Sequence, residues 1–325
     1  MSSEFTVVEP RLAPRPRRTG EHKAFTPGEP PAGAVPGDIN QTSSANSGIW
    51  SGAYLTRPSG SFTAIMAEWI VPAVVCLVDA PEEADVVIWV GLDNAAADLY
   101  QSGSHGLVWV WFDETVESDR TVVYTPWSFA NYWMWIECLP WTEYAIPNFP
   151  VSPGDLVHVS MFVAERDGSI AFSDGRITGY DNYMWFIVTN LSQLTVYEGL
   201  YPRGAVSFDG QHNTGFSGST AEFISERPGL TNGTTRPLAP FGAAIMNNCY
   251  TGDADQEDDW VGLAPIGGDP ADGSLNYYTM VGTDLFGDPL LAASVITVPV
   301  PQAAQLIWQW HSYGGAYFAA EPPAP

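Results

Sequence analysis

The sequence predicts an all-β protein, a double antiparallel-sheet β-sandwich. Three observations favour it: Trp, Tyr and Phe make up 13% of the residues, 31 glycines and 27 prolines divide the chain, and no segment has the pattern of a long amphipathic helix. Aromatic and β-branched residues favour strands, and Gly and Pro favour turns. Many short strands without helices indicate two packed sheets or a closed barrel, and the sandwich is the simpler arrangement.

In the first part of the chain, each predicted strand is an aromatic or β-branched run that ends at turn residues. The run "ADVVIWVGL" (84–92) is strongly apolar, which fits a strand. In "NYWMWIECL" (131–139), one acid stands among aromatic residues. The strands predicted here cover residues 49–55, 62–71, 84–92, 106–112, 121–125 and 131–139.

The series of strands continues to the end of the chain. The run "DLVHVSMFVAE" (155–165) alternates, so His158 is interpreted as a residue on a strand face. The acidic segment "TGDADQEDDWVG" (251–262) interrupts the pattern, but strands resume beyond it, which indicates an excursion from one domain. The remaining predicted strands are residues 155–165, 168–173, 183–190, 219–225, 241–250, 276–282, 293–298 and 304–314.

Residues 1–40 read as a Pro/Arg-rich tail, and residues 41–325 as one β-sandwich domain. The tail holds five of the twelve Lys and Arg residues: Arg11, Arg15, Arg17, Arg18 and Lys23. Two interpretations remain open for it, a disordered extension and a basic prosegment that covers an acidic cleft.

The formal charge of -25 argues against nucleic acid or an anionic membrane as a partner, because phosphate binding needs clustered cations. Acid unfolds proteins largely by protonating carboxylates that are paired with cations in the native state. A chain with 12 Lys and Arg and 5 His has few such pairs to lose. Acid tolerance is therefore one hypothesis, and an acidic surface kept for solubility or high salt is the other.

Common site signatures are missing. The sequence has no H-E-x-x-H, no G-x-S-x-G and no Walker loop, and the acidic segment 251–262 lacks the Gly and terminal Glu of an EF-hand. Cys76, Cys138 and Cys249 allow one disulfide at most. No run of 18 apolar residues and no signal peptide is visible. We expect no metal, no cofactor and no membrane span.

Two carboxylates within aromatic strands stand out. Glu137 lies in "YWMWIECLP" and Glu222 in "GSTAEFISERP". An acid flanked by apolar residues must be paired, raised in pKa or functional. The pattern alone leaves open whether each is a hydrogen-bonded structural acid or part of a site.

Several segments, taken in order, resemble the eqolisins, the glutamic peptidase family. "NSGIWSGAY", "SFTAIMAEWIVP", "IWVGLD" and "LYQSG" are similar to the family's first strands. "WIECLP", "VSPGDLVHV", "TAEFISERP" and "LAPFGAAIMNN" are similar to later ones. The likeness covers roughly residues 44–250 and leaves residues 1–40 outside. It implies a concanavalin-like jelly-roll sandwich and a metal-independent endopeptidase that acts on polypeptide in acid.

The resemblance places the family's catalytic glutamine on Gln101 and its catalytic glutamate on Glu222. Glu222 would remove a proton from the attacking water and later protonate the leaving amine. Gln101 would orient the water and donate to the oxygen that becomes negative. An amide suits this role because it donates at every pH, whereas two adjacent carboxylates would share a proton.

The resemblance also assigns a substrate wall, but with departures. Trp89, Asp93, Trp135 and Glu137 match family residues that line the cleft. Cys138, Leu139, Trp133 and His105 stand where the family has other residues, with His105 in place of an Asp. A histidine there is either an ordinary loop residue or a cation in acid that acts on the pKa of Glu222. The segment "FDETVESDRTVVYTPWSF" (112–129) looks like an insertion and suggests a lip over the cleft.

Two other function classes remain open. Jelly-roll sandwiches also serve as carbohydrate-binding or glycoside-hydrolysing proteins, for which Glu137 and Glu222 would be the carboxylate pair. A noncatalytic relative used for adhesion or assembly is the third interpretation. The family resemblance suggests an extracellular location, and the sequence leaves the oligomeric state, cleavage specificity and pH optimum undetermined.

Overall fold

The computed structural model contains seventeen β-strands and no helix in the part of the chain that it describes. This confirms the predicted all-β class. The described residues are 6–8, 44–58, 60–75, 83–93, 99–116, 122–139, 143–164, 183–202, 216–228, 235–252, 263–266, 275–283, 288–300 and 303–314.

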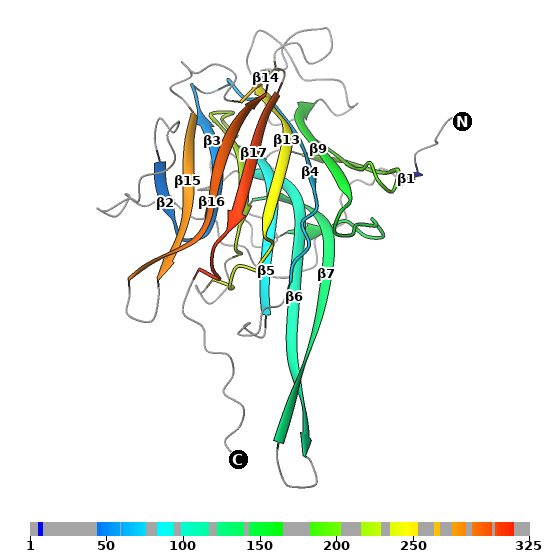
Figure 1. Cartoon of the computed structure of the whole chain (residues 1–325). Coiled ribbons are helices and arrows are strands. Elements are labelled where there is room, and N and C mark those ends of the chain that lie inside the picture. Colours follow the sequence, from blue (N-terminus) through cyan, green and yellow to red (C-terminus); the bar gives the residue numbers. More distant parts are fainter. Residues whose placement is uncertain are drawn as a thin grey trace.

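The first sheet carries most of the residues discussed below (Figure 1). Its strands are hydrogen-bonded in the order β15–β3–β12–β5–β6–β7–β8, and all of these pairings are antiparallel. The strands are β3 (Trp50–Thr56), β5 (Glu83–Leu92), β6 (Tyr100–Val116), β7 (Val122–Cys138), β8 (Tyr144–Ala145), β12 (Thr220–Glu226) and β15 (Leu275–Thr283).

The second sheet packs on the first and runs in the order β16–β17–β13–β4–β9–β10–β11–β1. Two short strands sit at edges: β2 pairs with β15, and β14 with β13. The strands are β1 (Thr6–Val8), β2 (Ser44–Ser47), β4 (Ala64–Ile70), β9 (Leu156–Ala164), β10 (Tyr183–Asn190), β11 (Thr195–Pro202), β13 (Ala243–Gly252), β14 (Leu263–Pro265), β16 (Pro289–Val300) and β17 (Ala303–Trp310).

Strand β15 belongs to both sheets. Residues 275–278 pair with β3 of the first sheet, and residues 280–283 pair with β16 of the second. The register shifts between Met280 and Val281, where the strand passes from one sheet to the other. The two sheets therefore form one sandwich that is joined along this edge, as the sequence predicts.

Strict alternation along the first sheet separates an inner face from an outer face. On β5, Val90 and Leu92 belong to the main core between the sheets, together with Trp69 and Phe186 of the second sheet. The neighbouring Trp89 belongs to a separate cluster on the outer face. Successive side chains of β5 point to opposite faces, and both faces are covered by apolar clusters. The sequence of β5 is therefore apolar almost without interruption.

Strands β6 and β7 form a hairpin of two 17-residue strands. Its pairing runs without interruption from Tyr100–Cys138 to Val116–Val122. The segments 121–125 and 131–139, predicted as two strands, are therefore one strand. The far end of the hairpin projects beyond the other strands (Figure 1), so residues 112–116 and 122–129 of the predicted insertion continue β6 and β7.

Some predictions lie outside the described residues or were incomplete. The described residues do not include the predicted strand 168–173, Cys76 or the part of the acidic segment beyond Gly252. Of residues 1–40, the structure describes only Thr6–Val8, which pair in parallel with β11. The sequence did not predict β11, whose alternation is broken by a glycine. In the described part of the chain, no helix is long and apolar enough to cross a membrane.

Candidate active site

The outer face of the first sheet brings Gln101 and Glu222 to either side of one glycine. Gly91 of β5 pairs with Gln101 of β6 through one edge and with Glu222 of β12 through the other. Directly paired residues of neighbouring strands point to the same face of a sheet. The two side chains therefore share a face, with backbones about 9–10 Å apart across two strand spacings.

Gly91 keeps the space between these two side chains open. A Cβ at this position would lie 2.7 Å from Cζ3 of Trp89, 2.9 Å from Cδ1 of Leu99 and 3.3 Å from Oε2 of Glu222. Any larger residue would enter the gap that separates the amide from the carboxyl group. Position 91 thus requires glycine, because the side chains of Trp89, Leu99 and Glu222 approach its Cα too closely for a Cβ.

The same row of paired residues continues on both sides. Glu137 of β7 pairs with Gln101, and its Oε2 accepts a hydrogen bond from Nε2 of Gln101. On the other side, Tyr54 of β3 pairs with Glu222. The order across the sheet is therefore Tyr54, Glu222, Gly91, Gln101 and Glu137.

The next row on this face holds the two predicted wall tryptophans. Trp89 of β5 and Trp135 of β7 pair with Gly103 from opposite sides. Both indoles are buried in the outer-face cluster. Nε1 of Trp89 donates to Oε2 of Glu226 at 2.8 Å. Buried carboxyl groups thus hold the side chains of this face in place.

Asp93 follows β5 and contacts the segment that leads into β12. Its carboxylate accepts hydrogen bonds from the backbone N–H of Ser217 and, at 2.6 Å, from the Ser217 hydroxyl. Its own N–H donates to the carbonyl of Thr220 at 3.0 Å. Asp93 is fully buried and has a left-handed backbone with φ of 80°, which Asp tolerates better than most residues. These contacts fix the start of the strand that carries Glu222.

Gln101 and Glu222 are both buried, with exposed fractions of 5% and 4%. Among the described residues, none supplies a hydrogen-bond partner to Oε1 of Gln101 or to Oε2 of Glu222. Burial raises the pKa of Glu222 well above the usual glutamate value, and the negative charge of Asp93 adds to the effect. The face therefore presents two oxygen atoms without a hydrogen-bond partner among the described residues, Oε1 of Gln101 and Oε2 of Glu222, and the carboxyl group of Glu222 is readily protonated.

The arrangement favours the amide–carboxyl pair over a pair of carboxyls. Gln101 and Gly91 lie between Glu137 and Glu222, whose backbones are three strand spacings or about 14 Å apart. The carboxylate of Glu137 is also engaged by Gln101. In the described part of the chain, no group of three or more His, Cys, Asp or Glu side chains is arranged to hold a metal ion.

The comparisons agree with the family predicted from the sequence. A model of the Peptidase A4 family matches residues 48–179. This segment resembles the Peptidase A4 family. The match confirms the predicted eqolisin resemblance and the enzyme class, a peptidase. It includes Gln101 and the four predicted wall residues, whereas Glu222 lies beyond its end.

Several solved structures are similar to this chain. Scytalido-glutamic peptidase with a transition state analog inhibitor is 16% identical, with a TM-score of 0.49, over 82% of this chain and 99% of that one. SCP-B, an eqolisin in complex with the tripeptide Ala-Ile-His, is 17% identical, with a TM-score of 0.43 and the same coverage. Aspergilloglutamic peptidase from Aspergillus niger is 15% identical, with a TM-score of 0.39, over 70% of this chain and 99% of that one. No curated protein matches.

Sequence reasoning missed three residues of this face. Gly91 and Tyr54 enter the row only through strand pairing, and Glu226 through its bond to Trp89. A signal existed for Gly91, because a glycine inside the otherwise apolar run "VVIWVGLD" indicates close approach of other groups. For Tyr54 and Glu226, the sequence pattern alone carries no such signal.

Proposed function

We propose that this chain is an endopeptidase of the glutamic type that hydrolyses peptide bonds with Gln101 and Glu222. The observation that carries the proposal is the pairing of both residues with Gly91. It supports an amide and a carboxyl group that lie on one face of the sheet, on either side of one glycine. The match of the segment around Gln101 to the Peptidase A4 family model supports the same class of reaction.

In this mechanism, Glu222 acts first as a base and then as an acid. Its carboxylate takes a proton from the water that attacks the scissile carbonyl, and the resulting carboxylic acid protonates the leaving nitrogen. Burial favours the protonated form of Glu222, so the carboxylic acid that protonates the leaving nitrogen is present in acid solution. The first step requires a pH at which part of the population is ionised, so we propose activity in weakly acid solution.

Gln101 stabilises the tetrahedral intermediate. One N–H of its amide is bound by Glu137, which fixes Nε2 on that side and determines the orientation of the amide plane. The second N–H is then available to the oxygen that becomes negative, and Oε1 can accept a hydrogen bond from the attacking water. Glu137 thereby acts on the reaction through the glutamine.

An extended polypeptide is the substrate that this face suits best. Trp89 and Trp135 are buried beside the dyad and would support the face on which the substrate lies, and sheet-like hydrogen bonds would hold its main chain. We propose residues 41–325 as the catalytic unit and, in keeping with the family resemblance, an extracellular site of action. Determining the N-terminal residue of the mature protein after incubation in acid tests whether residues 1–40 are removed.

The direct test is cleavage of denatured casein or haemoglobin between pH 2 and 7, with the wild type and two variants. Gln101→Ala and Glu222→Gln should each lose activity while the proteins stay folded. Gln309→Ala and Glu198→Gln, on strands of the second sheet, are matched controls and should cleave like the wild type. No cleavage by a folded wild-type protein at any pH would refute the proposal, and full activity in Gln101→Ala would refute the dyad.

A further inference from the structure

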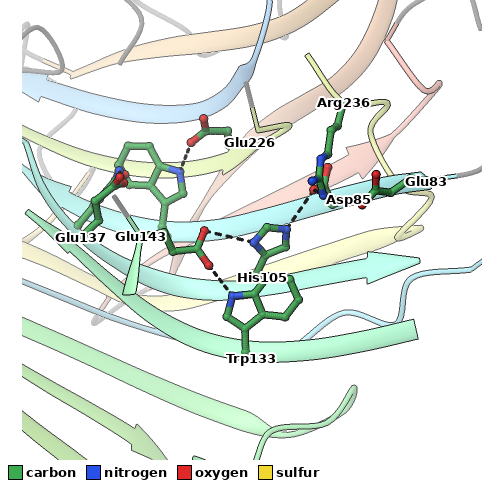
Figure 2. Close-up of polar contacts among 10 residues, drawn as sticks. Glu83, Asp85, His105, Trp133, Glu137, Glu143, Glu226 and Arg236 are labelled. Atoms are coloured by element: carbon green, nitrogen blue, oxygen red, sulfur yellow. Dashed lines mark hydrogen bonds and ion pairs between the residues drawn. The ribbon is translucent and has the colours of Figure 1, made fainter. Parts of the chain in front are cut away.

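A buried histidine lies on the same outer face, two pairing rows along the sheet from the dyad. His105 of β6 has Nε2 at 3.2 Å from Oδ2 of Asp85 and Nδ1 at 3.5 Å from Oε2 of Glu143. Its side chain is 5% exposed, and those of the two acids are 0% and 4% exposed. Figure 2 shows the ring bracketed by the two carboxyl groups.

This geometry assigns a proton to each ring nitrogen. A neutral imidazole has one donor and one acceptor nitrogen, so one of the two carboxylates would face a lone pair. The doubly protonated ring donates from Nε2 to Asp85 at 3.2 Å and forms an ion pair from Nδ1 with Glu143 at 3.5 Å. Burial alone would lower the pKa of His105, but the attraction of Glu143 and the hydrogen bonds to Asp85 and Glu143 outweigh it and raise the pKa.

The charged groups around His105 come from several elements. Asp85 is on β5, and Glu143 follows β7. Arg236 reaches Asp85 at 3.0 Å and the more exposed Glu83 at 2.9 Å. From β12, Glu226 faces the same side of the sheet and is bound to Trp89. Two acids, Asp85 and Glu143, thus contact the ring, and Arg236 contacts one of them, so loss of the imidazolium would leave buried negative charge.

His105 and Glu143 together hold a tryptophan of the outer face. Trp133 of β7 pairs with His105, and the two rings lie 4.0 Å apart at an angle of 31°. Nε1 of Trp133 donates to Oε1 of Glu143. Trp133 packs against the apolar cluster that contains Trp89 and Trp135. Its indole is therefore fixed on one side by the histidine ring and at its nitrogen by the acid.

We propose that His105 is a positioning residue whose imidazolium joins Asp85 to Glu143 and so fixes Trp133 as part of the substrate-binding face. The inference rests on the proposed function for its effect on catalysis, but the ion cluster itself is independent of activity. Deprotonation removes one donor, releases Glu143 from the ring and loosens Trp133. Substrate binding then weakens as the pH rises through the titration of His105.

The cluster is tested by an NMR titration of His105 in the full-length Glu222→Gln variant, which needs no activity. The ring should titrate above the ordinary histidine value of about 6.5. Glu143→Gln in the same background should lower the midpoint by about 1–3 pH units, because one opposite charge is lost. Glu198→Gln, on β11 of the second sheet, is the control and should leave it unchanged. A midpoint at or below 6.5, or one that Glu143→Gln does not move, overturns the proposal.

The effect on binding is tested in the active protein. His105→Gln should raise KM for a peptide substrate about 2- to 10-fold, the range expected for loss of an aromatic contact, with little change in kcat. Glu143→Gln should shift the alkaline rise of KM to lower pH in step with the NMR midpoint. A KM that is independent of pH and of both variants overturns the positioning role. Absence of any wild-type cleavage would refute the proposed function and leave the titration to decide the cluster.

Discussion

At the residue scale, the site depends on one amide and one carboxyl group whose chemical difference is set by their surroundings. Gln101 is held by Glu137, whereas Glu222 has a desolvated carboxyl group beside Asp93. The amide stays neutral at every pH, so only Glu222 titrates within the pair. The division of roles follows from this: the glutamine donates, and the glutamate moves protons.

Gln101→Ala should lower kcat by about 10²–10³, which corresponds to about 2.7–4 kcal/mol for the loss of one oxyanion donor. KM should change little, because the donor acts mainly on the charge that forms in the transition state. Steady-state kinetics with a chromogenic peptide measure both constants. A loss that appears wholly in KM would show that Gln101 binds substrate and has no special role in the transition state.

Glu222→Gln should abolish cleavage and stabilise the protein at neutral pH. The folded state raises the pKa of Glu222, so above the unfolded value of about 4.3 the folded state must hold a proton or bury a charge that the unfolded state does not. Stability from this residue is therefore present in acid and is lost as the pH rises. Melting curves should show the variant a few degrees more stable at pH 7 and equal to the wild type at pH 3. A variant less stable at pH 7 would contradict this.

At the element scale, the placement of the dyad depends on the pairing of β5 with both neighbours. The hairpin of β5 and β6 is local, so the position of Gln101 beside Gly91 follows from a short connection. The pairing of β5 with β12 joins residues that are far apart in the chain. A shift of β12 by one residue would turn Glu222 to the inner face. The contacts of Asp93 with Ser217 and Thr220 oppose such a shift.

Gly91→Ala should lower activity strongly and destabilise the protein by about 1–3 kcal/mol, since the added methyl group has no room beside Trp89 and Leu99. Gly48→Ala is the matched control, because a Cβ at Gly48 meets no atom within 4 Å. Urea unfolding and peptide cleavage measure the two effects. Wild-type activity in Gly91→Ala would mean that the gap beside Glu222 is not used.

These elements also show how much the sequence predicts. Strands with clear alternation, such as the one around His158, were located correctly because the side-chain period alone specifies them. Strand β11 was missed because Gly199 breaks its pattern. For the site, Gln101 and Glu222 were chosen by family resemblance, and their shared face is consistent with that choice. Gly91, Tyr54 and the partners of His105 depend on long-range register, which local pattern does not encode.

At the scale of the whole molecule, the charge balance bears on stability in acid. The described ion pairs are few: His105 with Asp85 and Glu143, His158 with Glu68, and Arg236 with Glu83 and Asp85. The pKa of Glu68 is lowered by its contact with His158, so its contribution is present above about 4.5 and is lost as the pH falls. Glu222 contributes with the opposite sign.

The melting temperature should therefore change by only a few degrees between pH 7 and pH 4. Differential scanning calorimetry across this range, at constant ionic strength, measures it. Repeating the scans at high salt separates acid tolerance from a salt-adapted surface, because salt screens exposed charges and has less effect on buried pairs. A steep fall in melting temperature already at pH 4 would show that carboxylate–cation pairs dominate the stability of this fold.

Strand β15 ties the last third of the chain to the dyad. One half of this strand hydrogen-bonds to β3, and it places Tyr278 against Trp50 and Tyr54 on the outer face. The other half is bonded to β16 of the second sheet. The two sheets therefore cannot separate at this edge without breaking the hydrogen bonds of β15. We expect the catalytic face and the C-terminal strands to unfold together as one cooperative unit.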